Sequence, residues 1–371
     1  MRELYICGSH YQVVNVLNIV YHKQDVSEKT LFIVNQFKKA ADIADKIKGT
    51  NLFSNVYLLQ PSEIVNMPFG IKRYVLAALN YLMPLRSLKD RFRGCEGVRV
   101  EKFINAFDVI YGIGVTHTAA AVLKLNPDAV FVLYDEGTGS YRENLMTMYR
   151  SRLKLLFCKI FGVGSYVRKP SKLLVNNVKM CRGASVSADR IFPLPEIDDG
   201  FKKLCGKIFE MDTEWKNSVL WLSQPATFLE GKTDERISAR EKIRSHLLPY
   251  KDRITVRMHY KDSDYEFYRD FDIDKGQCGW ELLLMNAGKK VNDLVLISVY
   301  SSAQITPKFI FDTEPTLIFL YRLYSTGASE EQITHMEEMI EDMRKAYRDP
   351  EKIYTPKTPE ELSAVLQKIF S

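Results

Sequence analysis

Nine short apolar segments, separated by stretches with helical spacing, determine the fold class that this sequence predicts. Their length and their β-branched and aromatic residues are typical of strands. Parallel strands need long crossover connections, usually helices, so strands that alternate with helices predict parallel sheets built from βαβ units. The segments form two sets, at 3–7, 30–35, 55–59, 108–114 and 129–137, and at 218–225, 253–259, 293–302 and 315–323. We therefore expect two α/β domains that face each other across a cleft.

A turn-rich stretch with prolines and a glycine, residues 192–200, separates the two sets, and such residues interrupt regular structure. We place the division after residue 205, which gives an N-terminal domain of residues 1–205 and a C-terminal domain of residues 206–371. Both have an ordinary domain length. The segment from Thr358 to Phe370 begins with a capping-box pattern and continues as an amphipathic helix. We expect this last helix to pack back on the N-terminal domain.

The charge of the chain argues against nucleic acid as a partner. The 52 Lys and Arg residues against 46 Asp and Glu give a formal net charge of +6, a small excess for 371 residues. Two segments, 72–102 and 150–182, are nevertheless basic and interleaved with apolar residues. They predict either a solvated basic face or a surface that rests on an anionic membrane.

The cysteines and the apolar segments indicate a compartment. The six cysteines are scattered and form no CxxC pair, which favours free thiols in a reducing environment. The N-terminus lacks the pattern of a signal peptide, and no apolar run reaches the ~18 residues of a membrane span. We expect a cytoplasmic protein with at most peripheral membrane contact.

Polar residues follow several of the expected strands, at the sheet edge where open parallel sheets bind ligands. Asp135 and Glu136 come directly after an apolar strand and precede Gly137 and Thr138. Two carboxylates at such a place can supply a general base. The alternative is a capped turn in which Asp135 accepts hydrogen bonds from backbone N–H groups.

Three later strand ends have groups that suit a phosphate. One carries Ser223, Gln224 and Pro225 and opens a loop that reaches Glu230, offering hydroxyl, amide and backbone donors. A plain βα loop would look the same.

His259 ends the next of these strands, between Arg257 and Lys261, where an imidazole could donate to a leaving oxygen. Ser301 and Ser302 end the third, where a phosphate could rest at the start of the following helix. Helix capping alone would explain these serines equally well.

Missing motifs narrow the function classes. The sequence has no GxGxxG after the first strand and no GxxxxGK[ST], GxSxG or HExxH, which disfavours dinucleotide oxidoreductases, P-loop kinases, α/β-hydrolases and zincins. Two acidic triplets, Asp262-Ser263-Asp264 and Asp272-Ile273-Asp274, do not follow an apolar strand directly. We interpret both as solvated loop acids rather than as a magnesium site.

In their order along the chain, these strand ends resemble the bacterial sialyltransferases, most closely the lipooligosaccharide sialyltransferases of glycosyltransferase family 52. That family has an acidic pair with glycine, then His-Pro, then a Ser/Thr pair. Here Asp135-Glu136-Gly137, His259 and Ser301-Ser302 stand in the same order. Tyr260 stands where the family has proline, and Ala226 stands where some relatives have an aspartate.

Two further segments resemble the same proteins. Gly279-Trp280-Glu281-Leu282 is similar to the segment whose glutamate lies near the nucleotide ribose, and Cys7-Gly8-Ser9-His10-Tyr11-Gln12 is similar to the first strand and loop. The resemblance therefore extends from residue 4 to about residue 325.

The resemblance implies a GT-B architecture of two Rossmann-like domains and an inverting, metal-independent transfer without cofactor. Sialic acid would pass from CMP-sialic acid to a galactose-terminated acceptor of a lipooligosaccharide or capsule. Asp135 would act as base, with Glu136 and Glu230 as substitutes, and His259 would assist the departing phosphate. The implied CMP-sugar contacts are Ser223, Gln224, Pro225, His259, Tyr260, Gly279, Glu281, Ser301 and Ser302. The implied acceptor-side residues are Ser9, His10, Gln12, Gly137 and Thr138.

Two alternatives stay open at this point. One is a transferase for another CMP-activated sugar, such as Kdo or another nonulosonic acid. The other is a non-catalytic assembly protein that binds CMP or a glycan. The sequence leaves the linkage, the acceptor and a homodimeric state undecided.

Overall fold

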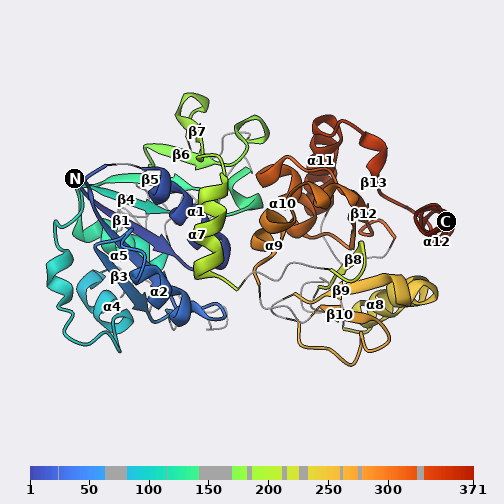
Figure 1. Ribbon diagram of the computed structural model, residues 1–371, viewed down its shortest axis with the longest axis horizontal. Helices are drawn as coiled ribbons and strands as arrows, with labels where there is room; N and C mark the ends of the chain where they lie inside the picture. The colour runs from blue at the N-terminus through green and yellow to red at the C-terminus, as the bar shows by residue number, and fades with distance from the viewer. Residues whose placement is uncertain are drawn as a thin grey trace. The chain divides into compact units, whose positions relative to one another are not determined.

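The chain divides into two compact units, Met1–Glu210 and Met211–Ser371. The computed structural model describes residues 1–23, 25–62, 82–114, 116–141, 169–181, 186–210, 215–224, 233–259, 262–274, 278–323 and 330–371. Each unit contains one all-parallel sheet with helices around it (Figure 1). The prediction of two α/β domains with parallel sheets is confirmed.

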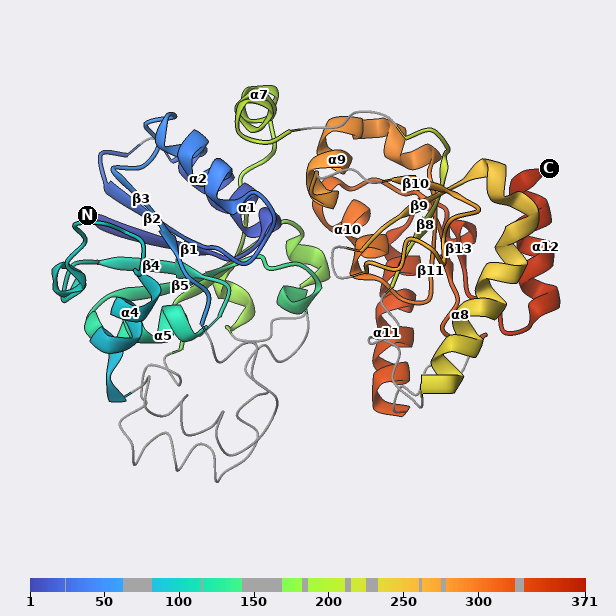
Figure 2. The same cartoon turned by 90° about the horizontal axis from the view of Figure 1, so that it is seen from below.

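Unit 1 is built on a seven-stranded sheet with the order β3-β2-β1-β4-β5-β6-β7. Strands β4 and β5 are apolar along their whole length, and β1 and β2 are apolar in their second half, as is typical of parallel strands covered by helices on both faces. Helices α1 and α2 lie on one face and α4 and α5 on the other (Figure 2). The strands are β1 (Arg2–Cys7), β2 (Glu28–Val34), β3 (Asn55–Leu59), β4 (Val109–Gly112), β5 (Val130–Tyr134), β6 (Lys172–Val175) and β7 (Ile191–Pro193). The helices are α1 (His10–His22), α2 (Ala40–Lys48), α4 (Pro84–Arg91), α5 (His117–Leu125) and α7 (Asp199–Ile208).

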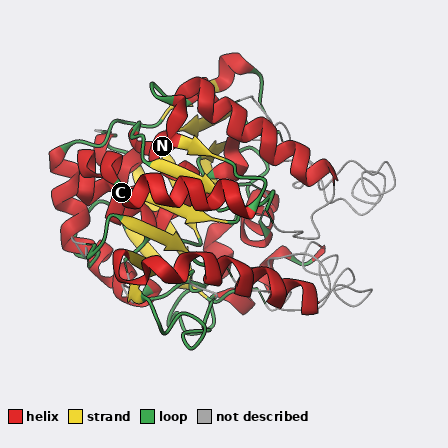
Figure 3. Ribbon diagram, turned by 90° about the vertical axis from the view of Figure 1, so that its right-hand side faces the viewer, coloured by secondary structure: helices red, strands yellow, loops and turns green. Residues whose placement is uncertain are grey.

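Unit 2 has a six-stranded sheet with the order β10-β9-β8-β11-β12-β13. Helices again flank its strands (Figure 3). The strands are β8 (Val219–Leu222), β9 (Ile254–Arg257), β10 (Asp272–Asp274), β11 (Val295–Ser298), β12 (Thr316–Phe319) and β13 (Ile353–Tyr354). The helices are α8 (Thr233–Leu247), α9 (Trp280–Ala287), α10 (Ser302–Phe311), α11 (Glu330–Ala346) and α12 (Pro359–Phe370).

The structure gives two details of the domains. Helix α7 runs past residue 205 and packs against α1 and α2, and unit 1 extends to Glu210. The last helix, α12, lies in unit 2. Its apolar residues Leu366 and Phe370 belong to the core of unit 2, together with Trp221 and Ile243.

The basic segments lie largely outside the described residues. Of 72–102, the structure describes 82–102, which includes α4; of 150–182, it describes 169–181, which includes β6. No helix among the described residues is long and apolar enough to cross a membrane.

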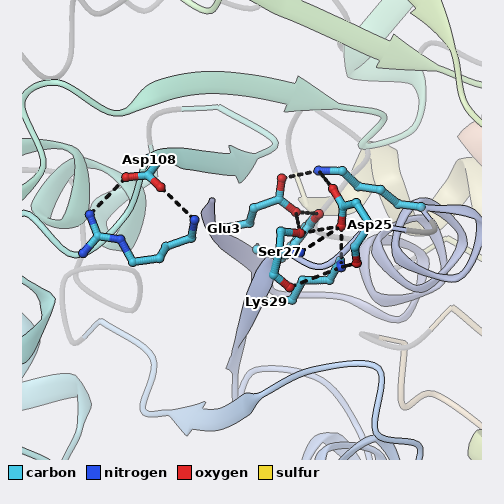
Figure 4. A network of polar contacts seen from close by, with 8 residues as sticks. Glu3, Asp25, Ser27, Lys29 and Asp108 are labelled. Carbon is cyan, nitrogen blue, oxygen red and sulfur yellow. Dashed lines mark hydrogen bonds and ion pairs between the residues drawn. The ribbon is translucent and has the colours of Figure 1, made fainter.

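A network of ion pairs around the buried Glu3 side chain lies at the amino-terminal edge of the unit 1 sheet (Figure 4). The Glu3 side chain is fully buried, forms an ion pair with Lys23 and accepts a hydrogen bond of 3.2 Å from the Ser27 hydroxyl. The Asp25 carboxylate lies 3.3 Å from the Lys23 ammonium and 2.7 Å from that of Lys29. The network joins the start of β1 to the end of α1 and the start of β2. It lies at the edge of the sheet opposite to the carboxyl ends of the strands.

Candidate functional site

In unit 1, the residues after β5 form a turn around the buried carboxylate of Asp135. Its Oδ1 accepts a hydrogen bond from the backbone N–H of Gly137 at 2.8 Å. Its Oδ2 accepts the Tyr141 hydroxyl at 2.5 Å and both the backbone N–H and the side-chain amide of Asn176, each at 3.1 Å. Four donors therefore meet this buried carboxylate, three on Oδ2 and one on Oδ1.

Local sequence explains why this turn forms. An aspartate commonly accepts a hydrogen bond from the N–H two residues further on, and glycine tolerates the positive φ that such a turn can need. Gly137 has φ +104°. The Ser140 hydroxyl accepts a hydrogen bond from the Glu136 N–H at 2.8 Å, and the Asn15 side chain donates to the Asp135 carbonyl at 2.9 Å. The turn is therefore held on both sides of Glu136.

The electrostatics of the turn follow from burial. Burial raises the pKa of Asp135, and the hydrogen bonds from Tyr141, Gly137 and Asn176 act against that increase. Burial likewise raises the pKa of Tyr141 well above its usual value, and the neighbouring Asp135 adds to the effect. Glu136, in contrast, is only partly buried. Of the two adjacent carboxylates, Glu136 is the one with exposed surface.

The loop between β1 and α1 is held by its own polar residues. The Ser9 hydroxyl caps α1 by accepting from the Gln12 N–H at 3.3 Å, and the Gln12 side chain accepts from the Gly8 N–H at 2.6 Å. The His10 ring lies edge-on to Phe37, with 4.7 Å between ring centroids, and burial lowers the pKa of His10. Three predicted acceptor-side residues thus lie together at the start of α1.

The next residue of α1 links this loop to the acidic turn. The Tyr11 hydroxyl accepts a hydrogen bond from the Asn176 side chain at 3.0 Å. Asn176 therefore donates to both Asp135 and Tyr11, and it connects α1, the turn after β5 and the end of β6.

In unit 2, the carboxyl ends of three strands are joined by side-chain hydrogen bonds. The buried Ser223 hydroxyl, after β8, accepts the backbone N–H of His259, after β9, at 2.8 Å. The Gln224 amide donates to the Tyr300 carbonyl at 2.5 Å and accepts from the Tyr300 N–H at 3.2 Å. The structure therefore brings Ser223, Gln224 and His259 together beside the end of β11.

Ser301 and Ser302 begin helix α10. The Ser301 hydroxyl caps the helix, and Gln304 completes a capping box. Gln304 is fully buried and also accepts from the Ser298 hydroxyl at 2.7 Å. The capping interpretation therefore accounts for Ser301, whereas Ser302 is exposed in the first turn of the helix. An N-terminal helical turn of this kind favours negative charge.

Helix α9 places the next predicted residues beside α10. Gly279 precedes the helix, and the Trp280 indole N–H donates to the Ala303 carbonyl at 2.8 Å. Glu281, in the first turn of α9, is partly buried. The connection before α9 is anchored to β9, because Arg257 donates to the Cys278 carbonyl.

The interpretation of the acidic triplets as solvated loop acids is wrong for three of their residues. Asp272 and Asp274 belong to β10; Asp272 accepts the Thr255 hydroxyl at 2.8 Å, and Asp274 pairs with Arg257 at 2.5 Å. Asp262 is 7% exposed. These acids hold elements of unit 2 together. Within the described part of the chain, no group of three His, Cys, Asp or Glu residues could hold a metal ion.

Some predicted residues cannot be placed. Pro225, Glu230 and Tyr260 lie outside the described residues, as does the side chain of Thr138. Conversely, sequence reasoning gave no role to a set of residues that build the two sites: Tyr11, Asn15, Tyr141, Asn176, Tyr300 and Gln304. Asn176 could have been predicted as a site residue, because it is a polar residue directly after the apolar segment KLLV.

Comparisons with known proteins give structural relatives only. No protein-family model matches the chain, and a comparison with curated proteins gives no match. A putative UDP-N-acetylglucosamine 2-epimerase from Listeria monocytogenes is similar, with a TM-score of 0.50 and 9% identity over 100% of this chain and 87% of that chain. A structure of S. aureus MnaA with UDP has a TM-score of 0.51 and 8% identity over 100% of this chain and 88% of that chain. At these identities the likeness concerns the fold, and the chain has the GT-B fold of two Rossmann-like α/β domains.

Proposed function

We propose that this chain is a glycosyltransferase that takes its sugar from a nucleotide-activated donor, and that the donor is CMP-sialic acid. The observation that carries this proposal is the place of the acidic pair, His259 and the two serines. All of them follow the carboxyl ends of parallel strands in a GT-B fold, which is where open α/β sheets bind ligands. The choice of CMP-sialic acid rests on the resemblance of this order of motifs to that of the bacterial sialyltransferases. The printed names of the two structural relatives concern UDP and UDP-N-acetylglucosamine, so UDP-sugars belong in the test.

Unit 2 would bind the donor. CMP-sialic acid has a single phosphate, which backbone N–H groups and hydroxyls at the start of a helix can hold without a divalent metal. The first turn of α10 with Ser302 offers such groups, and the His259 backbone is fixed by Ser223 beside it. The imidazole of His259 would donate to the departing phosphate.

Unit 1 would bind the acceptor and supply the base. The acceptor oxygen forms a bond to the anomeric carbon while the bond from that carbon to the phosphate oxygen breaks. The hydroxyl proton passes to a carboxylate, and CMP leaves with the bonding electron pair. Asp135 has no exposed surface and four hydrogen-bond donors. We therefore favour Glu136 as the base, with Glu230 as the remaining alternative.

Release of CMP or UDP by the purified chain tests this proposal. We would offer CMP-Neu5Ac, CMP-Kdo and UDP-GlcNAc, each with and without lactose. The expected result is lactose-dependent release from CMP-Neu5Ac, unchanged by a metal chelator. General acid–base groups contribute about 10²–10⁴-fold, so Glu136→Gln and His259→Ala should lower the rate by at least about 100-fold.

The other outcomes separate the alternatives. Release from CMP-Kdo alone would identify another CMP-sugar transferase. CMP binding without release from any donor would indicate a non-catalytic binding protein. Near-native transfer by His259→Ala would contradict the role given to that residue.

A further inference from the structure

We infer that Asp135, Tyr141 and Asn176 form a positioning cluster that fixes the direction of the Glu136 side chain, and that none of the three is itself the base. This inference rests on the proposed function, because it assigns residues that act through the proposed base. The cluster is defined as these three side chains.

The backbone on both sides of Glu136 is held by side chains. Before it, the Asp135 carbonyl accepts from Asn15 at 2.9 Å. The Glu136 N–H itself donates to the Ser140 hydroxyl at 2.8 Å. After it, the Gly137 N–H donates to the Asp135 carboxylate at 2.8 Å. With both flanking peptide groups fixed, the bond from Cα to Cβ of Glu136 has one direction.

The Asp135 carboxylate can hold the Gly137 N–H only if it is itself held. The Tyr141 hydroxyl and the two Asn176 donors all meet its other oxygen, Oδ2. These contacts prevent the carboxylate from rotating away from Gly137. Hydrogen bonds to an ionised acceptor are stronger than neutral ones, so a charged Asp135 suits this task better than an amide would.

Asn176 extends the cluster to a second element. Its side-chain amide donates to the Tyr11 hydroxyl at 3.0 Å, and the N–H of its neighbour Asn177 donates to the Tyr141 hydroxyl at 3.3 Å. The end of β6 thus fixes both the tyrosine that caps Asp135 and the helix beside the turn. A small shift at Asn176 would move Glu136 relative to an acceptor hydroxyl, and misplacement by about 1 Å can lower a rate by roughly 100-fold.

The test compares Asn176→Ala and Tyr141→Phe with the matched control Asn177→Ala. The Asn177 side chain accepts from the Met180 N–H and does not take part in the cluster. We expect the first two variants to lower kcat by about 10- to 100-fold with less than a threefold change in KM for donor and acceptor. The pH–rate profile should also change, because the base is no longer fixed in its surroundings. The control should keep wild-type kcat, KM and pH profile.

Amide hydrogen exchange provides a readout that needs no activity. In Asn176→Ala and Tyr141→Phe, exchange at the Gly137 amide should accelerate at least tenfold. Exchange should stay unchanged at the Ala119 amide, which lies in the first turn of α5, donates to the Thr116 hydroxyl that caps this helix and serves as a reference within unit 1. Tyr141→Phe removes a single oxygen and keeps the test usable if Asn176→Ala does not fold.

The outcomes distinguish this inference from the proposed function. Unchanged exchange at Gly137 overturns the positioning cluster, whether or not the chain transfers sugar. Wild-type kcat in both variants with accelerated exchange also overturns it, because the cluster would then hold the turn without affecting the base. Accelerated exchange together with no transfer by the wild type from any donor would refute the proposed function, and with it the role of the cluster in catalysis.

Discussion

Removing the cation from the buried ion pair of Glu3 and Lys23 should destabilise unit 1 strongly. The Glu3 side chain has 0% exposure, and besides Lys23 it is contacted by the hydroxyls of Tyr5 at 2.8 Å and Ser27 at 3.2 Å. Lys23→Met leaves this carboxylate buried with only neutral donors. A buried charge that loses its partner is far more costly than a pair removed as a whole.

The structure sets the expected magnitude. Breaking a buried pair by removing one partner costs about 3–5 kcal/mol. Lys23 is 25% exposed and two hydroxyl donors remain, so we expect the lower end, about 3 kcal/mol. Glu3→Gln should cost only about 1 kcal/mol, since Lys23 keeps Asp25 at 3.3 Å. The double variant should cost less than Lys23→Met alone.

Urea denaturation of the full chain can assign the effect to one unit. The three tryptophans, Trp215, Trp221 and Trp280, all lie in unit 2, whereas far-ultraviolet circular dichroism follows both units. Lys23→Met should shift the dichroism transition of unit 1 and leave the tryptophan fluorescence transition in place. Arg2→Met is the matched control, because the ion pair of Arg2 with Asp108 is 48% and 45% exposed; it should cost less than about 1 kcal/mol. A cost of Lys23→Met no larger than that of Arg2→Met would refute the reasoning.

Three further perturbations have defined outcomes. Burial acts to raise the pKa of Asp25, but its hydrogen bonds, the first of them from Lys29, lower the pKa overall. The pKa of an aspartate in the unfolded chain is about 3.9. The contribution of Asp25 to the stability of unit 1 is therefore present above about pH 4 and is lost as the pH falls further. Asp25→Asn should therefore weaken the acid dependence of the unit 1 transition between about pH 5 and 2, and an unchanged dependence would contradict this. Gln304→Leu leaves the Ser298 hydroxyl and two backbone carbonyls without their hydrogen bonds to Gln304. It should lower the free energy of unfolding of unit 2 by about 3 kcal/mol, seen as a fluorescence transition at a lower urea concentration. Equal urea midpoints for variant and wild type would contradict this. Gly137 has φ +104°, a backbone conformation that strains an alanine. Gly137→Ala should therefore lower the free energy of unfolding of unit 1, followed by dichroism, by about 1–3 kcal/mol. A wild-type transition would show that this position accepts a side chain without strain.

The parallel strands of both sheets were largely predictable, because most of the buried strand residues are apolar. Each of the nine expected segments overlaps a strand. Four strands were missed. Three of them are very short, β13 with two residues and β7 and β10 with three, and so brief a side-chain pattern does not separate a strand from a loop. The fourth, β6, has four residues, as many as several predicted strands, but it lies within a basic segment.

The acids of β10 show where a local pattern misleads. Asp274 pairs in register with Arg257 of β9, so the carboxylate meets a guanidinium on the adjacent strand. In the sequence the two residues are separated by a loop that begins with another acidic triplet. The register between two strands is a long-range property of the fold. The register of β9 and β10 is what shows that Arg257 is the partner of Asp274.

The same limit explains why the sequence led to Asp135 as the expected base, whereas the structure leads us to propose Glu136. Asp135 and Glu136 are adjacent and chemically similar, and both follow a strand that is almost wholly buried. Which of them is buried depends on β6, whose register pairs Leu174 with Tyr134 and so brings Asn176 to the acidic turn. The segment of β6 lies within a basic stretch that we interpreted as surface, and Asn176 was therefore not considered as a donor. Once that donor is placed, the buried carboxylate of Asp135, with its four donors, becomes the fixed member of the pair. The partly exposed Glu136 becomes the member that we propose meets a substrate.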